Sequence, residues 1–208
     1  MGDINLFELL LRVPPLLLAL TLHEYAHGWV ADRCGDPTAR LAGRLTFNPI
    51  VHLDPIGALC LLFAPFGWAK PVPVNPYNFR HPRRDDILVS LAGVGANIAT
   101  AITLAILIRL AYRFGFNPGN SQVVMALWLM VHILLLISVG LFLFNLIPLP
   151  PLDGSHVLRN LLPYDKAVAY ERIAPMASII LLVLIISGVV GRVLGPIHSF
   201  IIRILLGS

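Results

Sequence analysis

Long apolar runs dominate this chain and restrict what it can fold into. Residues 87–112 and 123–147 are almost entirely apolar, and each exceeds the roughly 20 helical residues that cross a bilayer core. Of the 208 residues, 57% are apolar and 12% are charged, and the mean hydropathy is +0.81. A soluble domain carries roughly 25% charged residues. We therefore expect an integral membrane protein.

The length of these runs also predicts the fold class. In lipid every backbone N–H and C=O must be paired inside the protein, and the runs are too long for barrel strands. We therefore expect an all-α polytopic membrane protein, a bundle of about four to six transmembrane helices. Pro14 and Pro15 should interrupt the first span, and a shorter run at 193–206 could return from the fourth. The expected spans are residues 4–31, 87–112, 123–147 and 173–190.

The region between the first two core helices is harder to interpret. Residues 55–68 are too few for a comfortable helical span, although a short crossing helix remains an alternative. The alternating pattern at 38–49 and the Pro- and Val-rich stretch at 70–79 suggest short strands. We therefore expect a re-entrant or β-hairpin element here, buried in protein or lining a wet cavity.

Two histidines and a glutamate lie inside the first apolar run, in the stretch HEYAH at residues 23–27. His23 and His27 are four residues apart, so a helix places both on one face. In the H-E-x-x-H pattern such imidazoles bind zinc, and Glu24 acts as general base on a water. Ionisable residues in a membrane segment are functional candidates, because burying them is costly. The alternative is that both histidines only hydrogen-bond to neighbouring helices.

A catalytic zinc site needs a third protein ligand and keeps one position open for water. Asp153 stands out because it follows the proline-rich stretch NLIPLPPL, which ends a helix, and has no adjacent basic residue to pair with. We favour Asp153 as the third ligand, with an ordinary Asp-Gly loop as the alternative. The full set of candidates expected to be buried is His52, His132, Asp153, His156 and His198.

Three stretches, in this order, resemble the site-2 protease family of intramembrane zinc metalloproteases. They are HEYAH at 23–27, SLAGVGAN at 90–97 and NLIPLPPLDG at 145–154. The stretches NPIVHLDPIGAL and FGWAKPVPVNPYNFR are similar to those of small bacterial members that lack PDZ and CBS domains. One departure is Val94, at a position where relatives often have proline.

The resemblance implies roles for five residues. His23, His27 and Asp153 would hold one Zn²⁺ per chain. Glu24 would be the catalytic acid and base. Asn97 would contact the substrate or the developing oxyanion, with an interhelical packing contact as the alternative.

The resemblance also implies the architecture and the substrate. All 208 residues would form a single membrane-embedded metalloprotease domain, with a catalytic core at about 4–158 and a C-terminal helical region at about 159–208. The substrate would be a transmembrane segment of another protein, cut within the lipid bilayer in regulated intramembrane proteolysis.

The chain's topology follows from where the three metal ligands must meet. His23 and His27 lie near the end of one helix, and Asp153 lies just past the end of another. The two helices must therefore run in the same direction, which takes an odd number of crossings between them. Residues 87–112 supply one crossing, so 55–68 should not cross the membrane.

The basic residues then predict the orientation. Ten of the fifteen Lys and Arg residues would lie on the side of the metal ligands. Positive residues favour the cytoplasmic face, so the zinc should lie nearer the cytoplasm of a bacterial plasma membrane, with the N-terminus outside. The ten are Arg33, Arg40, Arg44, Lys70, Arg80, Arg83, Arg84, Arg159, Lys166 and Arg172.

Other classes of protein are less consistent with the sequence. Cys34 and Cys60 are too few for a disulfide framework, and the net charge of +4 is better explained by membrane orientation than by nucleic-acid binding. A divalent-metal transporter would give Glu24 no task and usually shows internal repeats, which we do not find. A catalytically silent membrane scaffold would have no need of an intact H-E-x-x-H motif.

Overall fold

The computed structural model describes residues 6–54, 57, 69–119 and 121–207. These residues form α-helices and two 3₁₀ turns, which confirms the all-α fold. Four of the described helices, α4, α5, α7 and α8, are long and apolar enough to cross a membrane. The elements are α1 (Leu6–Cys34), α2 (Thr38–Leu41), η1 (Pro49–His52), η2 (Pro76–Asn78), α4 (Pro82–Arg113), α5 (Gln122–Asn145), α6 (Asp153–Leu161), α7 (Tyr164–Ile186) and α8 (Val189–Leu206).

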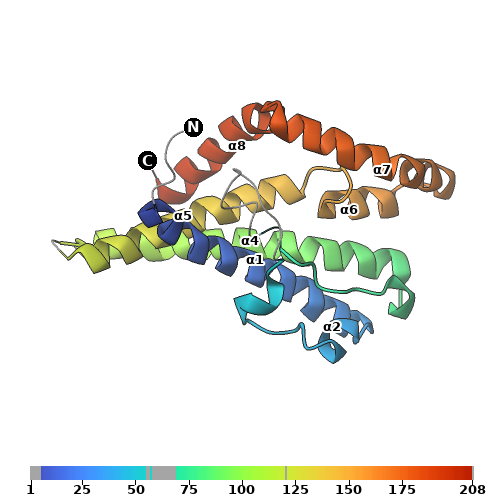
Figure 1. Cartoon of the computed structure of the whole chain (residues 1–208), viewed down its shortest axis with the longest axis horizontal. Helices are drawn as coiled ribbons and strands as arrows, with labels where there is room; N and C mark the ends of the chain where they lie inside the picture. Colours follow the sequence, from blue (N-terminus) through green and yellow to red (C-terminus); the bar gives the residue numbers. More distant parts are fainter. Residues whose placement is uncertain (1–5, 55–56, 58–68, 120, 208) are drawn as a thin grey trace.

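Helix α4 is the centre of the bundle. It packs against α1, α5 and α6, and α1 also packs against α5. In Figure 1, α1 and α5 run in the same direction and α4 runs opposite to both. The topology argument required this common direction, because α6 and its first residue follow the end of α5.

The C-terminal pair of helices forms a second layer over α4 and α5 (Figure 1). Helix α7 contacts α6 and α8, and α8 reaches α5 and α4. The last apolar run could have returned from the fourth span, but Figure 1 shows that α8 continues onward from α7 beyond a bend. Gly188 makes this bend with a φ of +73°, a left-handed conformation that glycine adopts without steric penalty.

The two prolines of α1 do not interrupt the helix, contrary to our expectation. Helix α1 is continuous from Leu6 to Cys34 through Pro14 and Pro15. A proline removes one intrahelical N–H donor, but membrane helices tolerate it because local adjustments and neighbouring helices satisfy the freed carbonyls. Helix α1 is therefore one continuous helix, which carries the H-E-x-x-H motif in its second half.

The strands expected at 38–49 and 70–79 do not form. Thr38–Leu41 is one helical turn, Pro76–Asn78 is a 3₁₀ turn, and the pairing seen in the described residues is one antiparallel bridge between Leu53 and Ala69. Three prolines in 70–79 lack the N–H that a strand ladder needs, which explains the absence of a second strand.

In Figure 1 the stretch from Ala69 to Asn75 nevertheless runs as an extended loop without a helical turn, and it is held on both sides. The Lys70 N–H donates to the carbonyl of His52 (2.8 Å), and Arg44 Nη2 donates to the Lys70 carbonyl (2.7 Å). The Asn75 N–H donates to the carboxylate of Asp36 (2.7 Å). These contacts fasten the stretch along the end of α1.

The expected re-entrant element falls at 55–68, which apart from Gly57 lies outside the described residues. The described residues on either side are neighbours, since Leu53 and Ala69 form the single bridge. The two residues that flank this segment therefore lie next to each other.

Two small apolar clusters hold the bundle together. Ala105, Ile108 and Leu135 are almost fully buried where α4, α5 and the end of α8 meet. At the other end, Ala31, Phe79 and Val89 join α1 to the start of α4. Many large apolar side chains on α7 and α8 are exposed, for example Ile179 and Ile186, as expected of helices that face lipid.

Candidate metal centre

The two histidines of the motif meet on one face of α1, as their spacing predicts. Their Nε2 atoms are 2.9 Å apart. His23 is buried and His27 is half-buried. Two imidazoles that converge in this way present two nitrogen ligands to one point.

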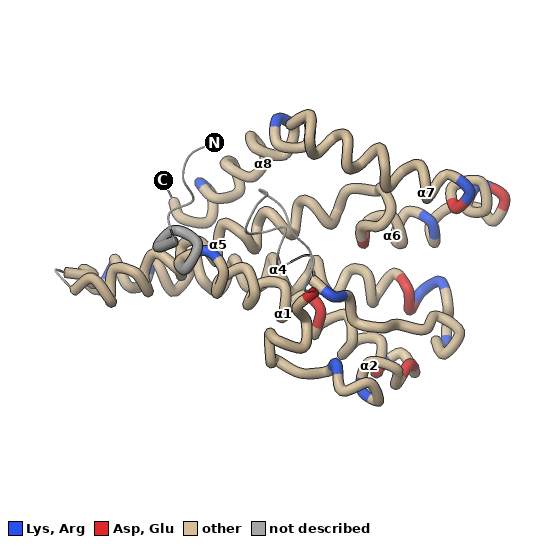
Figure 2. Tube along the Cα trace, in the orientation of Figure 1, with Lys and Arg blue, Asp and Glu red and all other residues tan. Residues whose placement is uncertain are grey.

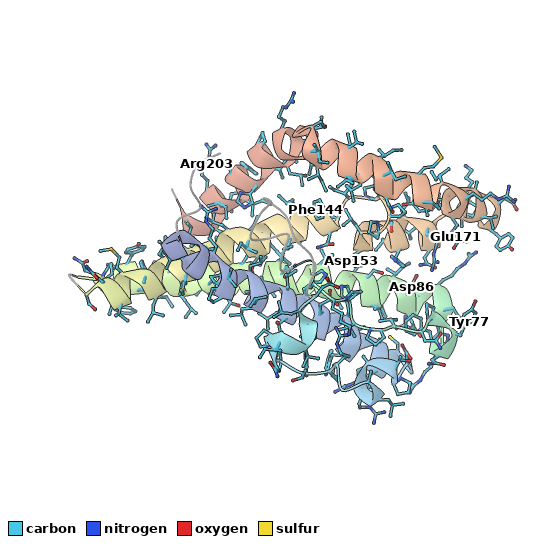
Figure 3. All side chains as sticks on the ribbon, in the orientation of Figure 1. Tyr77, Asp86, Phe144, Asp153, Glu171 and Arg203 are labelled. Carbon is cyan, nitrogen blue, oxygen red and sulfur yellow. The ribbon has the colours of Figure 1, made fainter. Side chains whose placement is uncertain are left out.

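Asp153 completes the cluster from a distant part of the sequence. It is the first residue of α6, which starts directly after the proline-rich link that follows α5. Its Oδ2 lies 3.3 Å from His23 Nε2 and 3.4 Å from His27 Nε2. Figure 3 shows Asp153 between α6 and α1, near the middle of the molecule.

The second nitrogen of each imidazole is also anchored, by α4. Nδ1 of His27 donates to the carbonyl of Val89 (2.8 Å), because a carbonyl can only accept. This contact leaves Nε2 of His27 without a proton and free to bind a metal.

Asn97, also on α4, lies beside the second nitrogen of His23. Its side-chain amide lies 2.9 Å from Nδ1 of His23, with Nδ2 as the nearer atom, and its buried Oδ1 has no hydrogen-bond partner. Turning the amide by half a rotation brings Oδ1 to Nδ1. The oxygen then gains a donor, and His23 takes the tautomer that offers Nε2 to a metal.

The cluster fits a zinc ion. Zinc bonds of about 2.0–2.1 Å in a tetrahedron place neighbouring ligand atoms about 3.3 Å apart, close to the distances of both histidines from Asp153. Asp153 Oδ2 is buried and makes no hydrogen bond, so a cation is the partner that its position calls for. Two nitrogens and one carboxylate oxygen match the three protein ligands of catalytic zinc sites, in which water or substrate takes the fourth position.

Glu24 has a backbone partner that the sequence did not reveal. The Val72 N–H donates to Glu24 Oε2 over 2.7 Å. Residues 71 and 73 are both proline and have no backbone N–H, so Val72 is the one residue of 71–73 that can donate from its backbone. One carboxylate oxygen is held by this bond, which orients the other.

Two glycines are needed for the site to close, and our motif analysis did not single them out. A Cβ on Gly93 would lie 2.3 Å from His27 Nε2 and 2.7 Å from His23 Cε1. A Cβ on Gly154 would lie 2.4 Å from the carbonyl oxygen of Leu146. Because neither glycine has a side chain, the histidine rings can pack against the backbone of Gly93, and the Leu146 carbonyl can pack against that of Gly154. In the sequence, the small residues of SLAGVGAN and the glycine after Asp153 could have indicated these close approaches.

The other histidine candidates lie apart from this cluster. His52 is buried and bonds through Nε2 to the Thr46 carbonyl, and His156 lies 3.6 Å from Asp86. His132 and His198 bond to carbonyls of Trp128 and Leu136. In the described part of the chain, the group of three residues that could hold a metal is His23, His27 and Asp153.

The fold and the cluster together define a helical membrane protein with a candidate metal centre between its helices. The sequence profile of Peptidase family M50 matches residues 13–188. The chain therefore belongs to peptidase family M50, the site-2 protease family, and the resemblance seen in its motifs is confirmed.

Curated relatives carry matching names. "Putative zinc metalloprotease YwhC" of Bacillus subtilis is 39% identical over 187 residues, covering 87% of this chain and 82% of that protein. "Putative zinc metalloprotease Rip2" of Mycobacterium tuberculosis H37Rv is 33% identical over 180 residues, covering 82% of this chain and 64% of that protein. The chain thus spans just under two thirds of the Rip2 sequence. No solved structure matches this chain significantly.

Proposed function

We propose that this protein is an intramembrane zinc metalloendopeptidase that cleaves transmembrane segments of other proteins. His23, His27 and Asp153 would hold one Zn²⁺ per chain, and Glu24 would be the catalytic acid and base. The observation that carries the proposal is the convergence of three ligand atoms, all within 4.8 Å of one another, beside the glutamate of an H-E-x-x-H motif.

The chemistry divides between the ion and the protein. When bound, zinc supplies a Lewis acid that polarises a carbonyl and makes water more acidic. Glu24 removes a proton from the attacking water and later delivers it to the nitrogen of the leaving amine. The Val72 N–H keeps one oxygen of Glu24 engaged, so that the other is presented to the water.

A helical substrate hides its peptide bonds in its own hydrogen bonds and must unwind before attack. The extended stretch Ala69–Asn75 passes beside Glu24 and is fastened to the protein at both ends. An unwound substrate that lies along this stretch would replace lost helical bonds with contacts to the extended backbone. Deleting residues 71–74 should abolish cleavage while zinc stays bound, and full activity after the deletion would refute this step.

Asn97 has two proposed tasks. It is fully buried and contacts His23, which supports a role in orienting that ligand. A direct contact with the substrate or with the oxyanion stays a prediction. It would require the Asn97 amide to leave His23.

For the cellular arrangement, we propose a bacterial plasma membrane with the metal centre nearer the cytoplasmic face and the N-terminus outside. Figure 2 shows charged residues gathered at the end formed by α2, the start of α4, α6 and the start of α7. That end carries most of the basic residues, which favour the cytoplasm. A reporter fused to Met1 that proves cytoplasmic would refute this topology.

The test of the function combines zinc stoichiometry with cleavage. We expect about one zinc per chain in the wild type and loss of zinc in both His23→Ala and Asp153→Ala. Glu24→Gln should keep the zinc and stop proteolysis, which a divalent-metal transporter does not predict. Zinc retained in Asp153→Ala would break the ligand set, and a wild type without zinc or proteolysis would favour a silent scaffold.

A further inference from the structure

An apolar pocket of about 220 Å³ lies between α4, the link that follows α5, and α6. Its wall on α4 is formed by Leu91 and Val94, and its wall on α6 by Val157 and Leu158. All of its lining side chains are apolar. The mechanism described above gives this pocket no task.

The pocket adjoins the metal centre on two helices. Val94 directly follows Gly93, where an added Cβ would clash with both histidine rings. Gly154, which also lines the pocket, directly follows the candidate ligand Asp153. One residue of extended chain spans about 3.3–3.6 Å. A peptide whose scissile carbonyl lies at the metal centre therefore has its flanking side chains within reach of the pocket.

The size and lining of the pocket select one kind of side chain. A dry apolar cavity of about 150 Å³ admits a benzene ring. A pocket of about 220 Å³ therefore has room for a leucine or phenylalanine side chain, whereas alanine would leave most of it empty. Charged or polar groups would enter without a partner and would be rejected.

We propose that this pocket is a specificity subsite, which takes a large apolar side chain of the substrate next to the scissile bond. The proposal rests on the proposed protease function and adds a substrate preference to it. Leucine or phenylalanine beside the cut should be favoured over alanine. Two of the residues that line the pocket, Val94 and Gly154, are next in sequence to Gly93 and to the candidate ligand Asp153. A substrate bound at the metal centre would therefore come close to the pocket, whereas a lipid chain has no need to approach that centre.

Leu91 allows a test with a matched control on the same helix. Leu91 lines the pocket and is 40% exposed, whereas Leu88, one turn earlier, is 42% exposed and does not line it. Leu91→Trp should fill the pocket and Leu91→Ala should widen it. Leu88→Trp and Leu88→Ala make the same changes in bulk outside the pocket.

The measurement uses the full-length protein in liposomes with synthetic peptides that carry one apolar segment. Mass spectrometry first maps the cut, and the residue beside it is then varied among Ala, Leu and Phe. In the wild type, Leu or Phe should be cut on the order of tenfold or more faster than Ala. Leu91→Trp should erase or reverse this ratio, Leu91→Ala should shift it toward Phe, and the Leu88 variants should leave it unchanged.

A second measurement does not depend on turnover. A photoreactive residue at position 91, in the Glu24→Gln background, should cross-link the peptide beside the mapped cut, and more strongly for Leu than for Ala. If no peptide is cut, the protease proposal fails. The subsite is then tested by looking for a cross-link from position 91 to any residue of the peptide. Cross-linking to lipid alone, or a cleavage ratio that is the same in both Leu91 variants, would overturn the subsite.

Discussion

Asp86 and Arg159 form an ion pair that joins α4 to α6, with Nη2 of Arg159 2.6 Å from Oδ2 of Asp86. Asp86 is only 5% exposed, and the side-chain amide of Asn160 donates to the same oxygen. In Figure 3 the labelled Asp86 lies along α4 from the metal centre, toward Glu171. Because α6 begins with Asp153, this pair holds the helix that presents the candidate carboxylate ligand.

Removing the guanidinium of this pair should destabilise the protein. Arg159→Met leaves the buried carboxylate of Asp86 without its positively charged partner. We expect the free energy of unfolding to fall by about 2–4 kcal/mol. The loss is moderate because Arg159 itself is partly exposed. Thermal unfolding in detergent measures this loss. Glu171→Gln is the control, because it removes the outer partner of Arg159, which is more than half exposed, and should cost at most about 1 kcal/mol.

Gly93→Ala should abolish metal binding. The new Cβ would lie 2.3 Å from His27 Nε2, so the imidazole must move away from the ligand position. Zinc content after purification measures the effect. Gly95→Ala is the matched control on the same helix, since nothing lies within 4 Å of its Cβ, and it should keep its zinc. Normal zinc in Gly93→Ala would mean that the histidines are not held as described.

Gly154→Ala should weaken zinc binding by a different route. Its Cβ would lie 2.4 Å from the Leu146 carbonyl oxygen, and because that atom belongs to the backbone, α6 must shift together with Asp153. We expect zinc affinity to fall about 10–100-fold, as when a ligand's support is lost. Competition with a chelator measures this fall. Gly140→Ala, whose Cβ has open space around it, should bind zinc like the wild type.

Val72→Pro should slow cleavage without releasing zinc. Residue 72 precedes a proline, so its backbone already favours the extended region that a proline can adopt. The substitution therefore mainly removes the N–H that donates a hydrogen bond to Glu24. We expect kcat to fall about tenfold or more, because charge-assisted hydrogen bonds are worth about 1.5–3 kcal/mol. Val72→Ala keeps the N–H and controls for lost packing. An equal loss in both variants would assign the effect to packing.

The stability of the loop after α1 should depend on pH through Asp36. Burial raises the pKa of Asp36, but hydrogen bonds from Thr38, the Asn75 N–H and Asn78 outweigh burial and hold the pKa below its ordinary value. Ionised Asp36 therefore stabilises the fold above the unfolded-state pKa of about 3.9, and this contribution is lost as the pH falls through the folded-state pKa.

Comparison with a variant that cannot titrate tests this dependence. Asp36→Asn should lower the free energy of unfolding by about 1–3 kcal/mol at pH 7. The gap from the wild type should narrow as the pH falls below about 4. A gap of constant size between pH 3 and pH 7 would show that the charge of Asp36 makes no contribution.

The sequence by itself determined the class of the protein and most of the candidate ligand set. Apolar runs of bilayer length dictate helices, because lipid leaves no other way to pair the backbone. A spacing of four residues puts His23 and His27 on one helical face whatever surrounds them. The proline stop before Asp153 marked the start of a new element. These features are local, so they can be predicted without knowing what packs against them.

Only the tertiary structure decided how these parts meet. The approach of α4 to the histidines through Gly93, the bond from Val72 to Glu24 and the pocket beside Gly154 all join residues distant in sequence. The strand prediction failed for the same reason. The valines of 70–79 suggested a strand, but its prolines cannot donate to a ladder. Side chains and carbonyls from other segments fasten this stretch instead. Contacts of this kind depend on packing between helices, which no local pattern encodes.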